Sequence, residues 1–139
     1  MGRVVELEIP PLSDHLALVR LVVESVARLD GTMPERRIDD MRLAVSEGCA
    51  NALDAQARAG SGAPILLTVE SGEGVTTVTI TDHAGGFEPS SVDPIPAATD
   101  PGRLRHERGL GIPLMQALVD EVDYSRTDDG TTLRLTTRA

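Results

Sequence analysis

Residues 43–52 read LAVSEGCANA and lie in the middle of an apolar-periodic stretch that predicts a long helix over residues 35–58. Side chains three or four positions apart share one face of a helix. The face expected to pack against a sheet consists of Met41, Val45, Gly48 and Ala52. The neighbouring face carries Glu47 and Asn51, one turn apart. This helix is therefore expected to present a carboxylate and an amide beside its apolar stripe.

Two residues near Glu47 are poor choices for a helix interior. The amide of Asn51 competes for backbone hydrogen bonds, and Gly48 costs about 1 kcal/mol relative to alanine. Such choices indicate a functional site, in which Glu47 could act as a general base and Asn51 could offer a neutral oxygen to Mg²⁺. An ordinary Glu and Asn on a solvated helix face remain the alternative interpretation.

The rest of the chain predicts a single domain, residues 1–139, in the order β-α-α-β-β-loop-α-β-β. Residues 88–107 contain four prolines and no regular period, so they are expected to form a loop. The remaining elements are strands at 4–9, 65–70, 75–81, 122–126 and 131–137, and helices at 14–29, capped by Ser13, and at 112–119. Because most strands come as hairpins, we expect an α+β fold with one mixed sheet and the helices on one face.

A second segment, residues 82–86, reads DHAGG and directly follows an apolar strand. At this position Asp82 would be at least partly buried. A buried carboxylate needs a hydrogen-bond donor, and the exocyclic amine of adenine is one. The glycines would let a ligand approach the backbone closely. An aspartate that merely starts a turn and closes a hairpin stays open as the alternative.

A third segment, residues 108–111, reads RGLG and leads into the predicted short helix over residues 112–119. Gly109 and Gly111 would then lie where unpaired N–H groups and the helix dipole attract anions. The loop before it carries Arg103, Arg105 and Arg108, which suits a lid over residues 88–108 with guanidinium groups facing phosphate. An ordinary glycine-rich helix start after a surface loop would look the same.

Composition narrows the class of function. All 13 basic residues are arginine. The absence of lysine excludes a G-x-x-x-x-G-K phosphate loop and a protein-kinase fold, so Mg²⁺, arginine and backbone N–H groups would have to meet phosphate charge. The net charge of −9 argues against direct nucleic-acid binding. A single cysteine, Cys49, and the lack of an apolar run of about 18 residues predict a cytoplasmic protein with no membrane segment.

In their order and spacing, the three segments resemble the GHKL (histidine kinase-like) ATPases. Residues 43–52 are similar to the N box of that family, residues 82–86 to its first glycine box and residues 108–115 to its second. The ending, residues 118–122 followed by 130–135, is similar to the small bacterial anti-sigma factor serine-protein kinases. The resemblance covers nearly the whole chain.

This resemblance implies a two-layer α/β sandwich, the Bergerat-type ATPase fold, with ATP and Mg²⁺ as cofactors. Asn51 would ligate Mg²⁺, Glu47 would be the catalytic base and Asp82 would bind the adenine amine. Further nucleotide contacts would come from Gly86 beside the base and, around the phosphates, from Arg105, Arg108, Gly109, Leu110 and Gly111. Members of the family, usually dimeric, hold a sigma factor inactive and phosphorylate a serine of an anti-anti-sigma partner.

The chain departs from the family pattern at three positions. Ala84 takes the middle position of the first glycine box, Glu107 stands where many members have glycine, and Gln56 stands where a histidine is common. Because of Ala84, a nucleotide-responsive binding module of the same fold, without catalysis, is the alternative to a kinase. The ATPase part of a sensor histidine kinase is a third interpretation. It is disfavoured because only one helix is predicted before the N-box helix.

Overall fold

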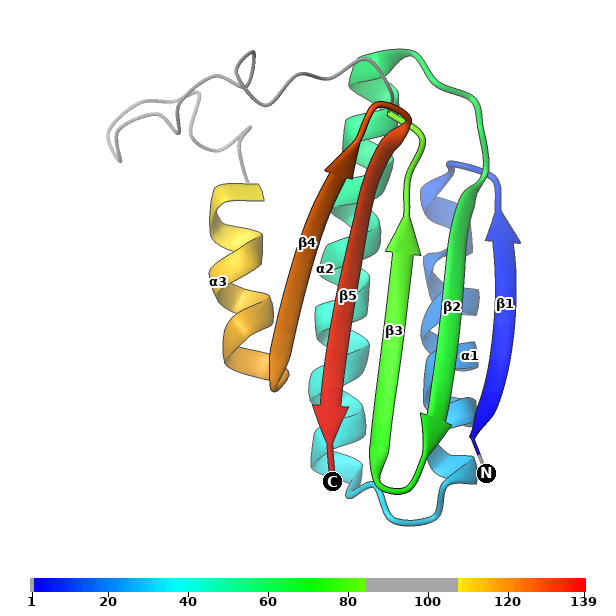
Figure 1. Ribbon diagram of the computed structural model, residues 1–139. Helices are drawn as coiled ribbons and strands as arrows, with labels where there is room; N and C mark the ends of the chain where they lie inside the picture. The colour runs from blue at the N-terminus through cyan, green and yellow to red at the C-terminus, as the bar shows by residue number, and fades with distance from the viewer. Residues whose placement is uncertain (1, 85–107) are drawn as a thin grey trace.

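The computed structural model describes residues 2–84 and 108–139, and for residues 108–111 it describes the backbone alone. Every predicted helix and strand is present (Figure 1). The elements are β1 (Arg3–Ile9), a 3-10 turn (Ser13–His15), α1 (Leu16–Leu29), α2 (Glu35–Ala59), β2 (Ile65–Gly72), β3 (Val75–Thr81), α3 (Arg108–Leu118), β4 (Glu121–Thr127) and β5 (Gly130–Arg138). The largest difference from the predicted bounds is at α3, which begins at Arg108 and so includes the RGLG segment.

The five strands form one sheet in the order β1-β2-β3-β5-β4. All neighbouring strands are antiparallel, which confirms the α+β class but differs from the expected mixed sheet. The reason lies in the connections. Two helices separate β1 from β2, and α3 together with β4 separates β3 from β5 (Figure 1). Two elements that each cross the molecule bring the chain back to the end where it left, so the next strand runs in the opposite direction.

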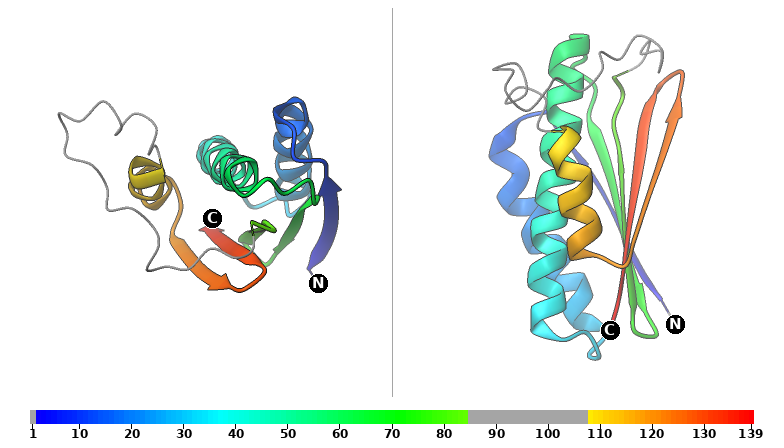
Figure 2. Two further views of the ribbon diagram at one scale, coloured as in Figure 1. Left: turned by 90° about the horizontal axis from the view of Figure 1, so that it is seen from above. Right: turned by 90° about the vertical axis from the view of Figure 1, so that its left-hand side faces the viewer.

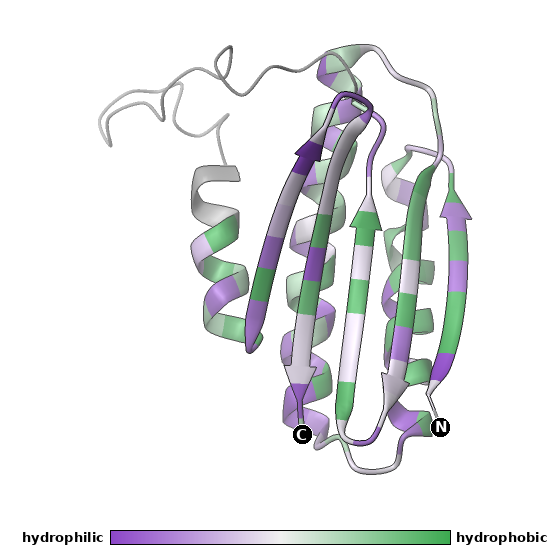
Figure 3. Ribbon diagram, in the orientation of Figure 1, coloured by the Kyte–Doolittle hydropathy of each residue, from purple (hydrophilic) through white to green (hydrophobic). Residues whose placement is uncertain are grey.

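The helices cover one face of this sheet (Figure 2). α2 lies between α1 and α3 and contacts both. Along β2, Ile65, Leu67 and Val69 are buried, while the residues between them are more exposed. The alternation of apolar and polar residues along the strands is visible in Figure 3. The core therefore fills the space between the helices and the inner face of the sheet, and its side chains are aliphatic apart from methionine and cysteine.

Two details of the helices follow from local bonding. The stripe predicted to face the sheet from α2, which consists of Met41, Val45, Gly48 and Ala52, is buried throughout. Ser13 does not cap α1. The N–H of His15 donates to the carbonyl of Leu12 at 3.2 Å and closes a 3-10 turn, so α1 begins later, with His15 at the cap position and no side-chain cap bond. Within the described ranges, no helix is both long and apolar enough to cross a membrane.

Candidate functional site

α2 carries Glu47 and Asn51 beside its buried stripe. Both residues are half-buried, and neither side chain forms a hydrogen bond or ion pair with a described residue. Their oxygen atoms are thus left to water or to a ligand. Carboxylate and amide oxygens are ligands that Mg²⁺ accepts. No group of three or more His, Cys, Asp or Glu side chains in residues 2–84 and 112–139 is arranged to hold a metal.

Gly48 brings this part of α2 close to the sheet. A Cβ atom at Gly48 would lie 2.8 Å from Leu133 Cδ2 and 2.9 Å from Ile80 Cδ1, closer than packed carbon atoms approach. The glycine in mid-helix therefore has a packing reason, since it lets α2 lie directly on β3 and β5. The same close approach brings Asn51, one turn further along, to the end of those two strands.

Asp82 follows β3 and is only 6% exposed. Its Oδ1 atom accepts hydrogen bonds from the N–H of Ala84 at 3.1 Å and from the N–H of Thr131 at 3.2 Å. The hydrogen bond from Ala84 closes a local turn, which is the alternative interpretation of Asp82 given by the sequence. The hydrogen bond from Thr131 is long-range and joins Asp82 to β5. No described residue donates to Oδ2. The carboxylate is held in place through one oxygen, and its other oxygen suits an N–H donor of a ligand.

Gly130 makes this arrangement possible. A Cβ atom there would lie only 2.0 Å from the backbone oxygen of Asp82 and 2.9 Å from its Oδ1 atom. Any larger residue would push β5 away from Asp82. The next residue, Thr131, both donates to the Asp82 carboxylate and accepts from the Asp82 N–H at 2.9 Å. The start of β5 is therefore fitted to the end of β3.

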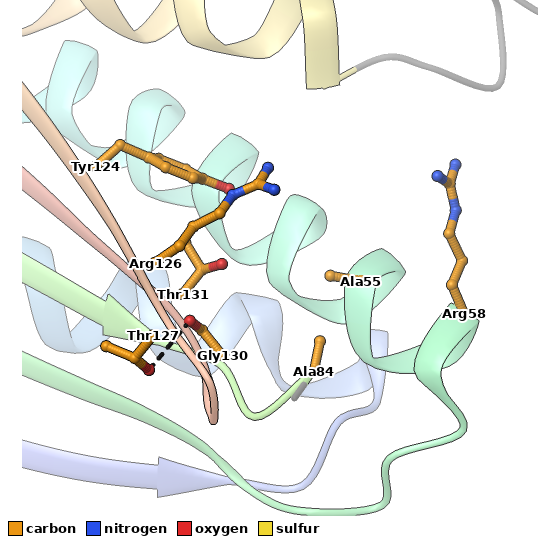
Figure 4. A pocket seen from close by; sticks show the side chains of 8 residues that line it. All are labelled: Ala55, Arg58, Ala84, Tyr124, Arg126, Thr127, Gly130 and Thr131. Carbon is orange, nitrogen blue, oxygen red and sulfur yellow. Dashed lines mark hydrogen bonds between the residues drawn. The ribbon is translucent and has the colours of Figure 1, made fainter. Parts of the chain in front are cut away.

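The structure brings Asn51 and Asp82, 31 positions apart in the sequence, to one pocket. This pocket, here called the inner pocket, is lined by Gly48, Asn51, Ala52, Ile80, Asp82, Tyr124, Thr131 and Leu133. A second, outer pocket is lined by Ala55, Arg58, Ala84, Tyr124, Arg126, Thr127, Gly130 and Thr131 (Figure 4). Tyr124 and Thr131 border both pockets. Polar groups thus converge on an otherwise apolar hollow, which is typical of a small-molecule site.

Gln56, a departure from the family pattern, has a clear structural role. It is fully buried at the end of α2. Its Nε2 atom donates to the carbonyl of Ala63 at 2.6 Å, and its Oε1 atom accepts from the N–H of His83 at 2.8 Å. The ring Nδ1 atom of His83 lies 3.0 Å from the carbonyl oxygen of Pro64. This cluster ties the end of α2 and the loop before β2 to the residue that follows Asp82.

The other predicted residues are described only in part. Gly86 and Arg105 lie outside the described residues, as does the predicted lid up to residue 107. Arg108, Gly109, Leu110 and Gly111 form the first turn of α3, described as backbone only. The glycine segment thus opens a helix, as predicted, and its role as an anion site stays a prediction. Glu47 is not among the residues that line either pocket and lies one turn before Asn51 on α2.

Three residues of the site, Tyr124, Gly130 and Thr131, were expected only as parts of a hairpin. Their contribution depends on the pairing of β3 with β5, in which Thr131 meets Asp82 across 49 positions of sequence. Gly130 and Thr131, which open the last strand, could have been selected from the sequence as site residues. They belong to residues 130–135, a segment that carries part of the family resemblance. Tyr124 gave no such signal.

Cys49 takes no part in this chemistry. It is buried on α2. Burial away from water disfavours the thiolate and raises the pKa of Cys49 to about 12. The thiol is therefore protonated at neutral pH and is not a nucleophile.

Comparison with known proteins agrees with this geometry. The chain belongs to the family described as histidine kinase-like ATPase domain, whose model matches residues 9–137. Among curated proteins it is similar to the Serine-protein kinase RsbW of Bacillus pumilus, at 29% identity over 138 residues, which are 95% of this chain and 83% of that protein. The RsbW of Halalkalibacterium halodurans is 30% identical over 137 residues, covering 95% and 81% of the two chains. The RsbW of Bacillus subtilis is 27% identical over 137 residues, covering 95% and 83%. The resemblance inferred from the three motifs is confirmed.

Proposed function

We propose that this chain binds Mg-ATP in the inner pocket and transfers the γ-phosphoryl group to a serine of a partner protein. The observation that carries this proposal is the meeting of Asn51 and Asp82 in one pocket. Membership of the histidine kinase-like ATPase family and similarity to serine-protein kinases over 95% of the chain support it.

The residues of the pocket fit the parts of such a ligand. The Oδ2 atom of Asp82 would accept a hydrogen bond from the adenine amine, while Oδ1 stays bonded to the backbone. Asn51, whose amide has no described partner, would offer its oxygen to Mg²⁺. Gly86 would border the base. Phosphate charge would be met at the start of α3 by Gly109, Leu110 and Gly111 and by the guanidinium groups of Arg105 and Arg108.

Bound Mg-ATP supplies the phosphoryl group, and the chain supplies a base. Glu47, half-buried and without a described partner, would accept the proton of the serine hydroxyl. As that proton leaves, the serine oxygen forms a bond to the γ-phosphorus, and the bond from that phosphorus to the bridging oxygen of ADP breaks. This requires the serine to reach Glu47 from the exposed side of α2.

The family resemblance extends the proposal to partners. The chain would hold a sigma factor inactive and would phosphorylate an anti-anti-sigma protein, acting as a homodimer in the cytoplasm. No contact with nucleic acid or a membrane is part of this proposal.

Glu47→Gln tests the chemistry, because it preserves size while removing proton acceptance. We expect the variant to bind ATP and the sigma factor as the wild type does. Its radiolabel transfer to an anti-anti-sigma protein should fall by about 10²–10⁴-fold. Equal and robust labelling by both proteins would remove Glu47 from the mechanism.

A non-catalytic, nucleotide-responsive binding module is the second candidate. It would show ATP-dependent sequestration and no labelling even by the wild type. Its support was Ala84 in the first glycine box. Among the described residues, however, only Glu73 combines a side chain with positive φ, so Ala84 has a backbone angle that alanine adopts readily. This observation favours the kinase.

A further inference from the structure

Tyr124 is the sole tyrosine of the chain and lies on β4, opposite Leu133 of β5. Leu133 is buried, whereas Tyr124 is 40% exposed. The ring of Tyr124 points along the strand toward Arg126, whose guanidinium carbon lies 5.8 Å from the ring centroid (Figure 4). The Tyr124 hydroxyl has no hydrogen bond with a described residue.

Tyr124 borders both pockets, and this position distinguishes it from the rest of β4. In the inner pocket it shares the lining with Asn51 and Asp82, and with the apolar side chains of Ile80 and Leu133. In the outer pocket it lies beside Arg126. A purine base has a flat π-face and a polar edge. The Tyr124 ring suits the π-face, and the Asp82 carboxylate suits an amine on the polar edge.

We propose that Tyr124 is a base-contacting residue that packs its ring against the purine of the bound nucleotide while Asp82 pairs with the amine. Arg126 acts through Tyr124 as a positioning residue, since its cation contacts the ring. This inference rests on the proposed function, because it takes the inner pocket as the nucleotide site. It adds a determinant of affinity for the base that the motifs do not contain.

The composition of the chain provides a direct test. It contains one tyrosine and no tryptophan, so tyrosine emission of the unmodified protein reports on Tyr124 alone. We expect this emission to change on titration with Mg-ATP and to reach half of its full change at the Kd that calorimetry gives. A solution of N-acetyltyrosinamide with the same nucleotide corrects for light absorbed by adenine.

Two variants separate the ring from the hydroxyl. Tyr124→Phe keeps the ring, so its Kd for Mg-ATP should stay within about 2-fold of the wild type. Tyr124→Leu keeps apolar bulk but removes the aromatic face, and its Kd should rise by about 5-fold or more. Ser125→Ala, on the opposite face of β4, is the matched control and should leave the Kd unchanged. Circular dichroism confirms that each variant is folded.

The outcomes distinguish the inference from the function on which it rests. Calorimetric binding of Mg-ATP with unchanged Tyr124 emission, or with equal Kd values for the wild type and Tyr124→Leu, would overturn the role of Tyr124 alone. If Tyr124→Leu fails to fold, the emission titration of the wild type still decides. No binding of Mg-ATP by the wild type would overturn both proposals.

Discussion

The two sides of the inner pocket differ in how the protein holds them. On the sheet side, Asp82 receives two backbone hydrogen bonds and fits tightly against Gly130. On the helix side, the side chain of Asn51, which lines the pocket, forms no hydrogen bond or ion pair with a described residue, and the same holds for Glu47, one turn before it on α2. The sheet side is therefore part of the folded architecture as well as of the site. On the helix side, the buried stripe of α2 packs on the sheet, but the polar side chains of Glu47 and Asn51 take no part in that packing and are available for a ligand. Substitutions on the two sides should accordingly have different effects on stability and binding.

Gly130→Ala should have the largest effect on stability. Its Cβ atom would lie 2.0 Å from the backbone oxygen of Asp82, which cannot move without breaking the β3–β5 pairing. We expect the free energy of unfolding to fall by about 3 kcal/mol in urea denaturation. Gly62→Ala is the matched control, because a Cβ atom at Gly62 meets no atom within 4 Å. A loss at Gly130 no greater than at Gly62 would show that the two strands are not fitted as described.

Asp82→Ala should affect both stability and binding. The change leaves the N–H groups of Ala84 and Thr131 without their acceptor, at a cost of about 1–3 kcal/mol in the free energy of unfolding. Asp82→Asn retains an acceptor oxygen, so its loss of stability should be smaller.

The same carboxylate should select the base of the nucleotide. Because guanine presents a carbonyl where adenine has its amine, the wild type should prefer ATP to GTP by about 10-fold to 100-fold.

Calorimetry with both nucleotides measures this preference, and Asp82→Asn should narrow it. Asp123→Asn, exposed on β4, serves as the control and should leave the ratio unchanged. Comparable binding of GTP by the wild type would contradict the assignment of Asp82 to the adenine amine.

Cys49 gives a smaller, pH-dependent effect. Its pKa is raised by burial from 9.0 to about 12, so the folded state retains the proton that the unfolded state loses. The stability linked to Cys49 is therefore complete below the unfolded pKa and is lost as pH rises toward the folded pKa. Urea denaturation near pH 10 should show a loss of about 1 kcal/mol in the wild type relative to neutral pH. Cys49→Ala should lack that part of the decrease, and an identical pH dependence in both proteins would contradict the burial argument.

How much of this structure the sequence predicts depends on how far apart in the sequence the contacting residues lie. Helical periodicity in α2 fixed which side chains face the sheet, because neighbours on a helix lie three or four positions apart. The hairpins β2–β3 and β4–β5 were predicted for the same reason, since their partners are close in sequence. The antiparallel direction of the whole sheet was not predicted, because it depends on how many elements cross the molecule between distant strands.

The candidate site divides in the same way. Asn51 could be selected because asparagine is an unfavourable choice in a helix interior, Glu47 because it lies one turn before Asn51, and Asp82 because it is an acidic residue that directly follows an apolar strand. Tyr124 could not, because an ordinary strand residue becomes part of a pocket only when β4 and β5 pair beside β3. The packing role of Gly48 likewise needed the positions of Ile80 and Leu133, which no local pattern provides.

Asn51→Ala provides the most direct test of the central claim that the inner pocket is a Mg-nucleotide site on its helix side. Because Asn51 has no described partner and alanine is a better helix former, the free energy of unfolding should stay within about 0.5 kcal/mol of the wild type or rise slightly. Calorimetry with ATP and ADP, each with and without Mg²⁺, should show weaker binding of both nucleotides and little remaining dependence on the metal. Equal affinity and equal Mg²⁺ dependence in the wild type and the variant would contradict the account.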